Sequence, residues 1–311
     1  DILLSDDTKL TIDACRNLGA KIELVGDKAI IEGFAGVPKP EIGARIFLGN
    51  SGPSVRLLAS VAALSKIPVI LDGDRRMRER PIRDLLDALN SAGANARSLD
   101  GNDCPPIEVR SENGFCGGEI EVSGKISSQF LSSLLLVSPL ARKKTVIRVK
   151  DGLKSKPYAA ITMELMRLFG AMVDNDNYSK FEVLPAGAYK ARKYKVEGDY
   201  SSASYFFAAA AVTGSTVAVT GLNPDSVQGD AKFLGILSSM GAAVSRQEDG
   251  RITVRGPPQL RGAGEIDCSD CPDAVQTICA VAACADGTTK ITNVGHLRHK
   301  ESDRILDTVE E

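Results

Sequence analysis

The feature that most constrains this chain is a helical pattern that returns about every 74 residues. Four amphipathic segments each end in Gly-Ala, and their glycines, Gly19, Gly93, Gly170 and Gly241, are spaced by 74, 77 and 71 residues. In the second segment apolar residues recur at i, i+3, i+4 and i+7, the stripe of a helix that lies on a sheet. Glycine just past a helix end is the usual C-terminal stop. The spacing therefore predicts a repeated unit that contains one outer helix.

A second set of helices lies out of phase with the first. These segments start near Ser51, Ser127, Ser201 and Pro272, at intervals of 76, 74 and 71 residues. Each is apolar almost all round and rich in Ala and Ser, which is typical of a helix buried inside a domain. Short β-branched runs lie between the two sets: VILDG (69–73), EIEVSG (119–124), TVIRVK (145–150), KYKVEG (193–198), TVAVTG (216–221) and TKITNV (289–294). Strands that alternate with helices at a fixed long period predict one α/β unit repeated about four times.

Composition excludes several classes of protein. The 311 residues suffice for two domains, and no apolar run approaches the length of about 18 residues that spans a membrane. The 38 basic and 40 acidic residues exclude a globally basic nucleic-acid binder. Seven scattered cysteines predict free thiols in a reducing cytoplasm. Cys268 and Cys271 have the spacing of metal ligands, but no second such pair or close histidine pair completes a zinc set.

The stretch LGNSGPSVRLL (48–58) allows two interpretations. In the first, Ser51 or Gly52 caps a helix and Pro53 occupies its first turn. In the second, the free N–H groups and the helix dipole bind an anion, and Arg56 lies close by. The stretch alone leaves both open.

Three further stretches place basic residues at the start of outer helices: GDRRMRERPIRD (73–84), LKSKPY (153–158) and HLRHKESDR (296–304). A charge run is most often a solvated face. Arg80, however, comes directly before the Pro81 that marks a helix start, where an arginine fork reaches an anion. Because neither aromatic platforms nor a broad basic face is present, we expect a small anionic ligand and no nucleic acid.

The motifs also carry a resemblance. LGNSGPSVR, RMRERPI, SGKISSQFLSSLLL, KSKPY, VEGDYSSASYFFAAAA, CPDAVQT and HKESDR occur in the order and spacing of the 5-enolpyruvylshikimate-3-phosphate (EPSP) synthase family, over essentially all 311 residues. GHLRHKESDR is most similar to the archaeal branch. The resemblance implies an α/β fold of two domains, the enolpyruvyl transferase fold or inside-out α/β barrel, built from βαβαββ units around buried helices with the active site between the domains. We expect the domains at 1–197 and 198–311.

The resemblance further implies the reaction. Members transfer the enolpyruvyl group of phosphoenolpyruvate to the 5-hydroxyl of shikimate 3-phosphate and release phosphate, a step of chorismate and aromatic amino-acid biosynthesis. No metal and no organic cofactor takes part. We expect a cytoplasmic monomer whose partners are these two small molecules, with no nucleic acid and no membrane.

Family roles transfer to matching positions. The resemblance implies that one set binds shikimate 3-phosphate: Ser127, Ser128, Gln129, Ser155, Tyr158, Asp273, His296 and Lys300. It implies that a second set binds phosphoenolpyruvate: Asn50, Gly52, Arg80, Gln129 and Arg304. Asp273 is the expected proton acceptor from the 5-hydroxyl, and Glu301 is the candidate for proton transfer at the methylene of phosphoenolpyruvate.

Plainer interpretations of single residues stay open. Asp273 is alternatively a helix N-cap, and Glu301 is alternatively a first-turn acid that the helix dipole favours. Ser201 and Ser202 are predicted to be caps and not ligands.

The sequence also departs from the family pattern. A lysine–serine motif with a downstream arginine is expected before residue 1, and an Asp-His-Arg arginine and a further lysine are expected after residue 311, so we expect a chain shortened at both ends. Pro53 and Leu57 replace a common threonine and proline, and His296 replaces the asparagine of bacterial members.

Two alternative functions follow. One is a catalytically impaired fragment that only binds shikimate 3-phosphate. The other is UDP-N-acetylglucosamine enolpyruvyl transfer, although the loop GDRRMRERP lacks the cysteine that such enzymes usually carry there.

Overall fold

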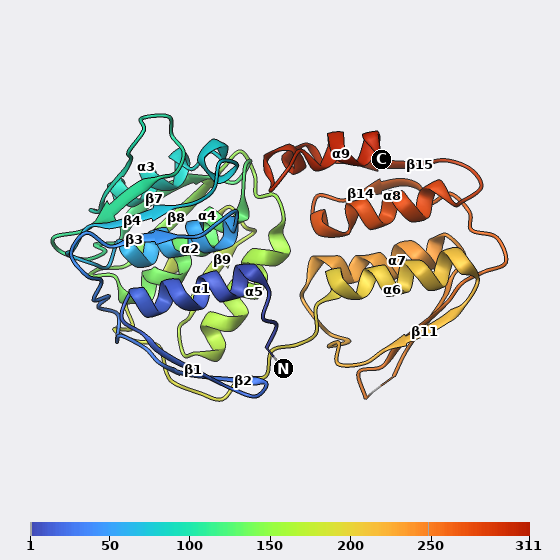
Figure 1. The fold of residues 1–311 in the computed structure, drawn as a ribbon, viewed down its shortest axis with the longest axis horizontal. Coiled ribbons are helices and arrows are strands. Elements are labelled where there is room, and N and C mark those ends of the chain that lie inside the picture. The colour runs from blue at the N-terminus through green and yellow to red at the C-terminus, as the bar shows by residue number, and fades with distance from the viewer. Residues whose placement is uncertain (1, 248) are drawn as a thin grey trace. The chain divides into compact units, whose positions relative to one another are not determined.

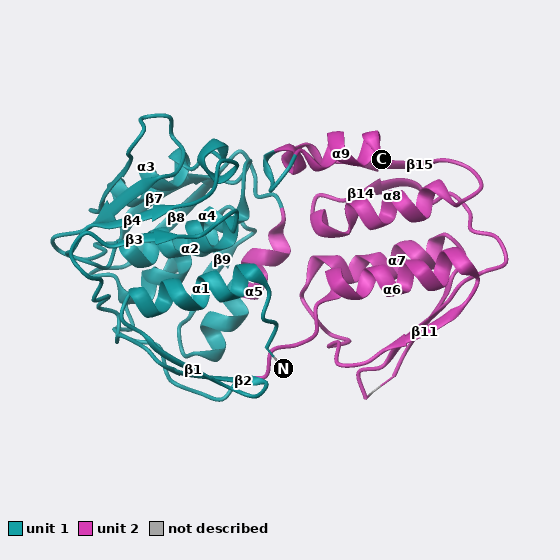
Figure 2. Cartoon of the chain, viewed as in Figure 1, with its two compact units in different colours: residues 1–154, 162–194, 299–302 teal, residues 155–161, 195–298, 303–311 magenta. Residues whose placement is uncertain are grey.

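The computed structural model describes residues 2–247 and 249–311 (Figure 1). The chain divides into two compact units (Figure 2). Unit 1 comprises Asp1–Lys154, Thr162–Tyr194 and His299–Ser302, and unit 2 comprises Ser155–Ile161, Lys195–Arg298 and Asp303–Glu311. Residues 155–161 thus belong to unit 2, although the residues on either side of them belong to unit 1. Residues 299–302 belong to unit 1, although their neighbours along the chain belong to unit 2. The domain boundary after residue 197 stays a prediction.

Residues 45–183 contain the order β-α-β-α-β-β twice, all within unit 1 except the start of α5, whose residues 156–161 belong to unit 2. The first repeat consists of β3 (Arg45–Phe47), α2 (Gly52–Ala62), β4 (Val69–Asp72), α3 (Arg83–Ser91), β5 (Asn95–Ser98) and β6 (Ile107–Arg110). The second consists of β7 (Gly118–Ser123), α4 (Ser128–Val137), β8 (Thr145–Lys150), α5 (Lys156–Leu168), β9 (Val173–Asp176) and β10 (Lys180–Val183). The sheets have the matching orders β3-β4-β6-β5 and β7-β8-β10-β9. In each sheet only the first two strands are parallel, because a buried helix connects them.

The remaining elements of unit 1 flank these repeats. Helix α1 (Asp6–Asn17) precedes the hairpin of β1 (Lys21–Val25) and β2 (Lys28–Glu32). Two 3-10 turns, η1 (Met77–Glu79) and η2 (Ser138–Leu140), follow β4 and α4.

Unit 2 continues the same order. Its first repeat consists of α6 (Tyr200–Thr213), β11 (Thr216–Val219), η3 (Gly229–Ala231), α7 (Lys232–Ser239), β12 (Ala243–Arg246) and β13 (Ile252–Arg255). Then follow β14 (Gly264–Asp267), η4 (Pro272–Ala274), α8 (Val275–Ala283), β15 (Thr289–Thr292), η5 (Gly295–His299) and α9 (Arg304–Glu310). The sheet β11-β13-β12 has the order of the unit 1 sheets without their first strand, and β14 pairs with β15 in parallel. The predicted βαβαββ repeat is confirmed.

One predicted strand is wrong. Residues 193–198, KYKVEG, form no strand. The end of this segment is linked to the residues after β11 by a hydrogen bond from Gly198 N–H to Gly221 O at 2.9 Å. The same position in the first repeat carries the bond from Leu48 N–H to Asp72 O at 2.8 Å. The segment alternates charged and apolar residues as a strand does, but Tyr194 and Val196 are about half exposed. Because the apolar side chains of this segment are only about half buried, the alternation does not produce a strand.

The outer helices end as predicted. Gly19, Gly93, Gly170 and Gly241 have φ of 103°, 90°, 90° and 104°, a backbone conformation that side-chain-bearing residues rarely adopt. The regular spacing of these glycines in the sequence therefore reflects four equivalent helix ends.

The predicted buried helices pack in parallel pairs. In unit 1 the Ser133 hydroxyl of α4 donates to the backbone oxygen of Arg56 and to Ser60 Oγ in α2. In unit 2 Ser204 of α6 and Thr277 of α8 share a hydroxyl–hydroxyl bond of 3.2 Å, also 73 residues apart. In unit 1, α2 and α4 are buried on most sides, whereas β1 and β3 are exposed on one side, so these two helices lie inside the unit.

Helix α6 departs from the expectation of burial all round. Tyr205 and Phe206 are each more than 60% exposed, because α7 and α8 pack on the opposite face that contains Ala203 and Phe207.

Two further sequence predictions concern membranes and thiols. Among the described helices, none combines the length and the apolar character needed to cross a bilayer. All seven cysteines are free, and Cys268 and Cys271 are both buried.

The end of β4 is held by one buried carboxylate. Asp72 accepts two hydrogen bonds from Arg78, at 3.0 and 2.8 Å, and one from Arg45 at 3.1 Å. The Gly73 N–H donates to the same carboxylate at 2.8 Å. Burial by itself raises the pKa of Asp72, but the hydrogen bonds from Arg78 and Gly73 outweigh burial, so that its pKa lies below the ordinary value. Asp72 thereby anchors the loop that leads to Arg80.

We expect Asp72→Asn to lower the melting temperature at neutral pH, because the variant loses a buried charge that three cationic or N–H donors stabilise. A lowered pKa contributes stability above the ordinary aspartate value of about 3.9, and this contribution disappears as the pH falls through the folded-state pKa. Melting temperatures from about pH 7 to about pH 2 should therefore show a gap between parent and variant that closes in acid. The control is Asp13→Asn, which alters an exposed pair with Arg16 and should change little. A gap for Asp72→Asn that stays constant down to the acid limit contradicts the assignment.

Candidate active site

The loop 48–51 leads from β3 into α2 and leaves the helix start polar. Ser51 is the N-cap of α2, and Pro53 lies in the first turn, as the first interpretation of this stretch predicts. Within the described residues, however, Ser51 Oγ pairs with Ser54 Oγ at 2.6 Å and caps no helix N–H. The Ser51 side chain therefore does not occupy the first N–H groups of α2, the groups that bind anions at helix starts.

Arg80 lies buried against this helix start, with only 2% of its surface exposed. Its Nη1 donates to the backbone oxygen of Asn50 at 2.8 Å and to Asn50 Oδ1 at 3.2 Å. Its Nη2 donates to Glu301 Oε1 at 3.3 Å, and Asn50 Nδ2 donates to the backbone oxygen of Glu301 at 3.3 Å. Three residues of the sequence prediction thus form one cluster in unit 1.

Gly52 gives Arg80 the room to lie there. A Cβ atom at Gly52 would lie 2.3 Å from Arg80 Nη2 and 2.7 Å from its Cζ. Because real Cβ contacts are never that short, any side chain at this position displaces the guanidinium. The lack of a side chain at Gly52 therefore lets the Arg80 guanidinium lie close to the backbone of α2.

Arg56 is a second buried cation in unit 1, and the sequence prediction assigned it no role. It is 4% exposed, and its Nη1 donates to Gln129 Oε1 at 2.7 Å and to Ser127 Oγ at 3.4 Å. Ser127 is the N-cap of α4 and also accepts from Gln129 N–H at 3.2 Å. The guanidinium lies 5.3 Å from the centre of the Phe130 ring. The signal for Arg56 was its place as the one charged residue in an apolar helix.

The charge of Arg56 interacts with the charges of Arg80 and Glu301. Burial lowers the pKa of Arg56, the positive charge of Arg80 lowers it further, and Glu301 offsets part of this effect. No ion pair in the described part of the chain includes Arg56. Two buried cations therefore share one carboxylate at the adjacent starts of α2 and α4. Such a region favours an anionic ligand.

In unit 2 three predicted residues form another cluster. Arg304 Nη1 donates to Asp273 Oδ1 at 2.6 Å, and the Tyr158 hydroxyl donates to Asp273 Oδ2. Burial and then the charge of Asp273 raise the pKa of Tyr158 far above its ordinary value. The phenol therefore stays protonated and acts as a donor. Asp273 thus faces a cation on one oxygen and a neutral donor on the other.

The plainer interpretations of four residues are wrong. Asp273 lies inside η4, and Ala274 is the N-cap residue of α8. Glu301 precedes α9, whose N-cap is Asp303. Ser201 and Ser202 are not caps, because Asp199 accepts a hydrogen bond from the N–H of each.

The other arginines of the stretch 73–84 follow the plainer interpretation. They form ion pairs with nearby carboxylates: Arg75 and Arg76 with Glu79, Arg78 with the buried Asp72, and Arg83 with Asp87 and Asp103. Arg80 alone in this stretch is a buried arginine.

The structure also places four further residues of the predicted set. Ser128 is buried at the start of α4, and Ser155 is buried directly before α5. His296 is buried in η5. Lys300 precedes Glu301, and its backbone oxygen accepts from Arg76 Nη2 at 3.3 Å. Their roles toward ligands stay predictions.

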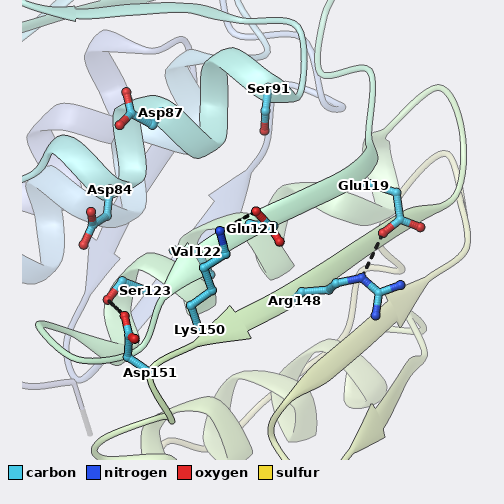
Figure 3. A pocket seen from close by; sticks show the side chains of 10 residues that line it. All are labelled: Asp84, Asp87, Ser91, Glu119, Glu121, Val122, Ser123, Arg148, Lys150 and Asp151. Carbon is cyan, nitrogen blue, oxygen red and sulfur yellow. Dashed lines mark hydrogen bonds and ion pairs between the residues drawn. The ribbon is translucent and has the colours of Figure 1, made fainter.

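A separate open cavity of about 690 Å³ lies over α3, β7 and β8 (Figure 3). Five of its ten lining residues are acidic and two are basic, and the basic pair, Arg148 and Lys150, forms ion pairs with Glu119 and Glu121. None of the predicted substrate residues lines it. Its charge opposes an anionic substrate.

Comparison with known proteins gives consistent results. A family model described as EPSP synthase (3-phosphoshikimate 1-carboxyvinyltransferase) matches residues 1–311. The chain is 42% identical to a 3-phosphoshikimate 1-carboxyvinyltransferase of Methanospirillum hungatei over 304 residues, which is 97% of this chain and 70% of that relative. It is 43% identical to the protein of the same name from Serratia proteamaculans over 308 residues, 98% of this chain and 71% of the relative.

Solved structures extend the likeness to the fold. An EPSP synthase from Acinetobacter baumannii superposes with a TM-score of 0.78 at 25% identity, covering 99% of this chain and 70% of that one. The enolpyruvyl transferase NikO from Streptomyces tendae superposes with a TM-score of 0.64 at 17% identity, covering 91% of this chain and 66% of that one. The second likeness concerns the fold alone.

Proposed function

The chain belongs to the EPSP synthase family, and we propose that it transfers the enolpyruvyl group of phosphoenolpyruvate to the 5-hydroxyl of shikimate 3-phosphate and releases phosphate. One observation carries the assignment of residues. The two arginines proposed to bind phosphoenolpyruvate, Arg80 and Arg304, are each paired with one proposed acid–base carboxylate, Glu301 and Asp273. This pairing supports a site in which an arriving anion replaces a carboxylate at each arginine.

The proposed binding roles follow the available donors. Arg56 occupies the oxygen of the Gln129 side chain, so the Gln129 amide N–H groups remain to meet an acceptor. Ser127 Oγ already accepts two hydrogen bonds, so its own proton is available to a phosphate or hydroxyl oxygen. Both side chains thus present donors, which suits the phosphate of shikimate 3-phosphate.

The proposed chemistry needs no group beyond side chains. Glu301 gives a proton to the methylene carbon of phosphoenolpyruvate while Asp273 takes the proton of the 5-hydroxyl, and the oxygen bonds to the central carbon. The tetrahedral intermediate then loses phosphate by cleavage of a carbon–oxygen bond. The phosphate takes the proton held by Asp273, and a proton from the methyl group returns to Glu301 and restores the double bond. Arg80 and Arg304 stabilise the negative charge that develops.

The alternative functions have less support. The relatives found carry the name of the shikimate enzyme, and the loop 73–81 holds no cysteine, unlike enzymes that use UDP-N-acetylglucosamine. A cytoplasmic location and a monomeric state remain parts of the proposal, the first supported by the seven free thiols.

The proposed reaction is tested by mixing the chain with phosphoenolpyruvate and one of two acceptors. We expect phosphate release and a product of enolpyruvyl mass with shikimate 3-phosphate, and neither with UDP-N-acetylglucosamine. Turnover of UDP-N-acetylglucosamine alone overturns the assignment. Binding of shikimate 3-phosphate by folded protein without any turnover supports the impaired-fragment alternative instead.

Asp273→Asn separates catalysis from structure. The asparagine oxygen can still accept from Tyr158 or Arg304, so we expect a small change in melting temperature. Loss of the base should lower turnover by about 10²–10⁴-fold. Asp303→Asn is the matched control, because asparagine caps α9 about as well as aspartate and should leave turnover intact. Turnover of Asp273→Asn within a few-fold of the parent would rule out Asp273 as the proton acceptor.

A further inference from the structure

The turn 268–271, between β14 and η4, contacts the starts of two helices in unit 2. Ser155 N–H donates to the backbone oxygen of Ser269 at 3.1 Å. Asp270 Oδ1 accepts from Lys156 N–H at 3.2 Å, and Asp270 Oδ2 pairs with Lys232 Nζ at 3.3 Å. A single carboxylate thus joins the start of α5 to the start of α7.

The start of α5 needs such support because its backbone is strained. Ser155 has a φ of 54°, in the left-handed region, although it carries a side chain. This conformation typically costs about 1–3 kcal/mol and persists only where neighbours hold it. The hydrogen bonds from Ser155 N–H and Lys156 N–H, both to the turn 268–271, lie directly at the strained residue. Lys156 N–H is also one of the helix-start donors that lack a partner within the helix.

The turn is fixed from its other side as well. A Cβ atom at Gly229 would lie 1.8 Å from the backbone oxygen of Asp270 and 3.0 Å from Pro157 Cγ. The backbone of Asp270 is therefore packed tightly against η3 beside the first turn of α5. Since no side chain fits at Gly229, the position of Asp270 has little freedom.

We propose that Asp270 is a positioning residue that holds Ser155 and Tyr158 at the start of α5 in register with Asp273, which follows three residues later in η4. This inference rests on the proposed function, which gives Ser155, Tyr158 and Asp273 their ligand roles. Asp270 itself touches no substrate. It acts through the Lys156 N–H, whose bond sets the orientation of the strained Ser155 and of the Tyr158 hydroxyl that reaches Asp273.

Steady-state kinetics of three variants test this role. Asp270→Ala removes the acceptor, and we expect the KM for shikimate 3-phosphate to rise by about tenfold while the KM for phosphoenolpyruvate changes less. Asp270→Asn keeps an oxygen for the Lys156 N–H and should restore values near those of the parent. Lys232→Met removes only the ion pair and is the matched control, with kinetics close to the parent. Parental kinetics in Asp270→Ala, or equal losses in Asp270→Ala and Lys232→Met, overturn the proposal.

Hydrogen exchange makes the test independent of turnover. Exchange of the backbone amides of Ser155, Lys156 and Tyr158 should be faster in Asp270→Ala than in the parent, and the exchange rates in Asp270→Asn should be close to those of the parent. If the parent chain proves inactive, the proposed function fails, while this exchange pattern still decides the positioning role. Unchanged exchange in Asp270→Ala contradicts it.

Discussion

The close packing of two parallel buried helices in each unit is the constraint on which the rest of the structure depends. Serine and threonine hydroxyls make this packing possible, because they are small and satisfy one another, as Ser60 does with Ser133 and Ser204 with Thr277. In both pairs the two partners are 73 residues apart, which is about one repeat length. Parallel helices that touch along their length also start side by side. In unit 1 this places the start of α2 next to that of α4.

The adjacent helix starts explain why buried cations gather in unit 1. Arg56 extends from α2 to Ser127 and Gln129 at the start of α4, and Arg80 lies on the backbone at Gly52. Burying a guanidinium is unfavourable unless hydrogen bonds or an anion compensate for the lost hydration. Glu301 supplies one negative charge for two cations. The remaining positive charge and the helix dipoles form a region where a phosphate or carboxylate is favoured.

Much of the fold could be predicted from the sequence, because periodic patterns reflect burial directly. The four Gly-Ala ends, the two helix sets and five of the six β-branched runs correspond to observed elements. The run 193–198 failed because alternation indicates a strand only where one face is buried, and Tyr194 and Val196 are both about half exposed.

The candidate site was less accessible to sequence reasoning. The resemblance identified Asn50, Arg80 and Glu301, which the structure brings together, but it could not indicate that Gly52 is small because Arg80 lies on it. Capping preferences misplaced Ser201 and Ser202, since Asp199 precedes them and is the stronger acceptor. Arg56 and Asp270 act through contacts more than 70 residues away in the chain, which no local pattern encodes.

The central claim is that buried cations at the starts of α2 and α4 bind an anionic substrate, and the most direct test is calorimetric titration of shikimate 3-phosphate into Arg56→Leu and Arg83→Leu. Both variants lose one positive charge in unit 1, but Arg56 is buried beside Gln129, whereas Arg83 is exposed and paired with Asp103. With both variants shown to be folded by circular dichroism, the account predicts that Arg56→Leu weakens binding by about 10–100-fold and that Arg83→Leu binds like the parent. Equal affinities for the parent and Arg56→Leu would contradict it.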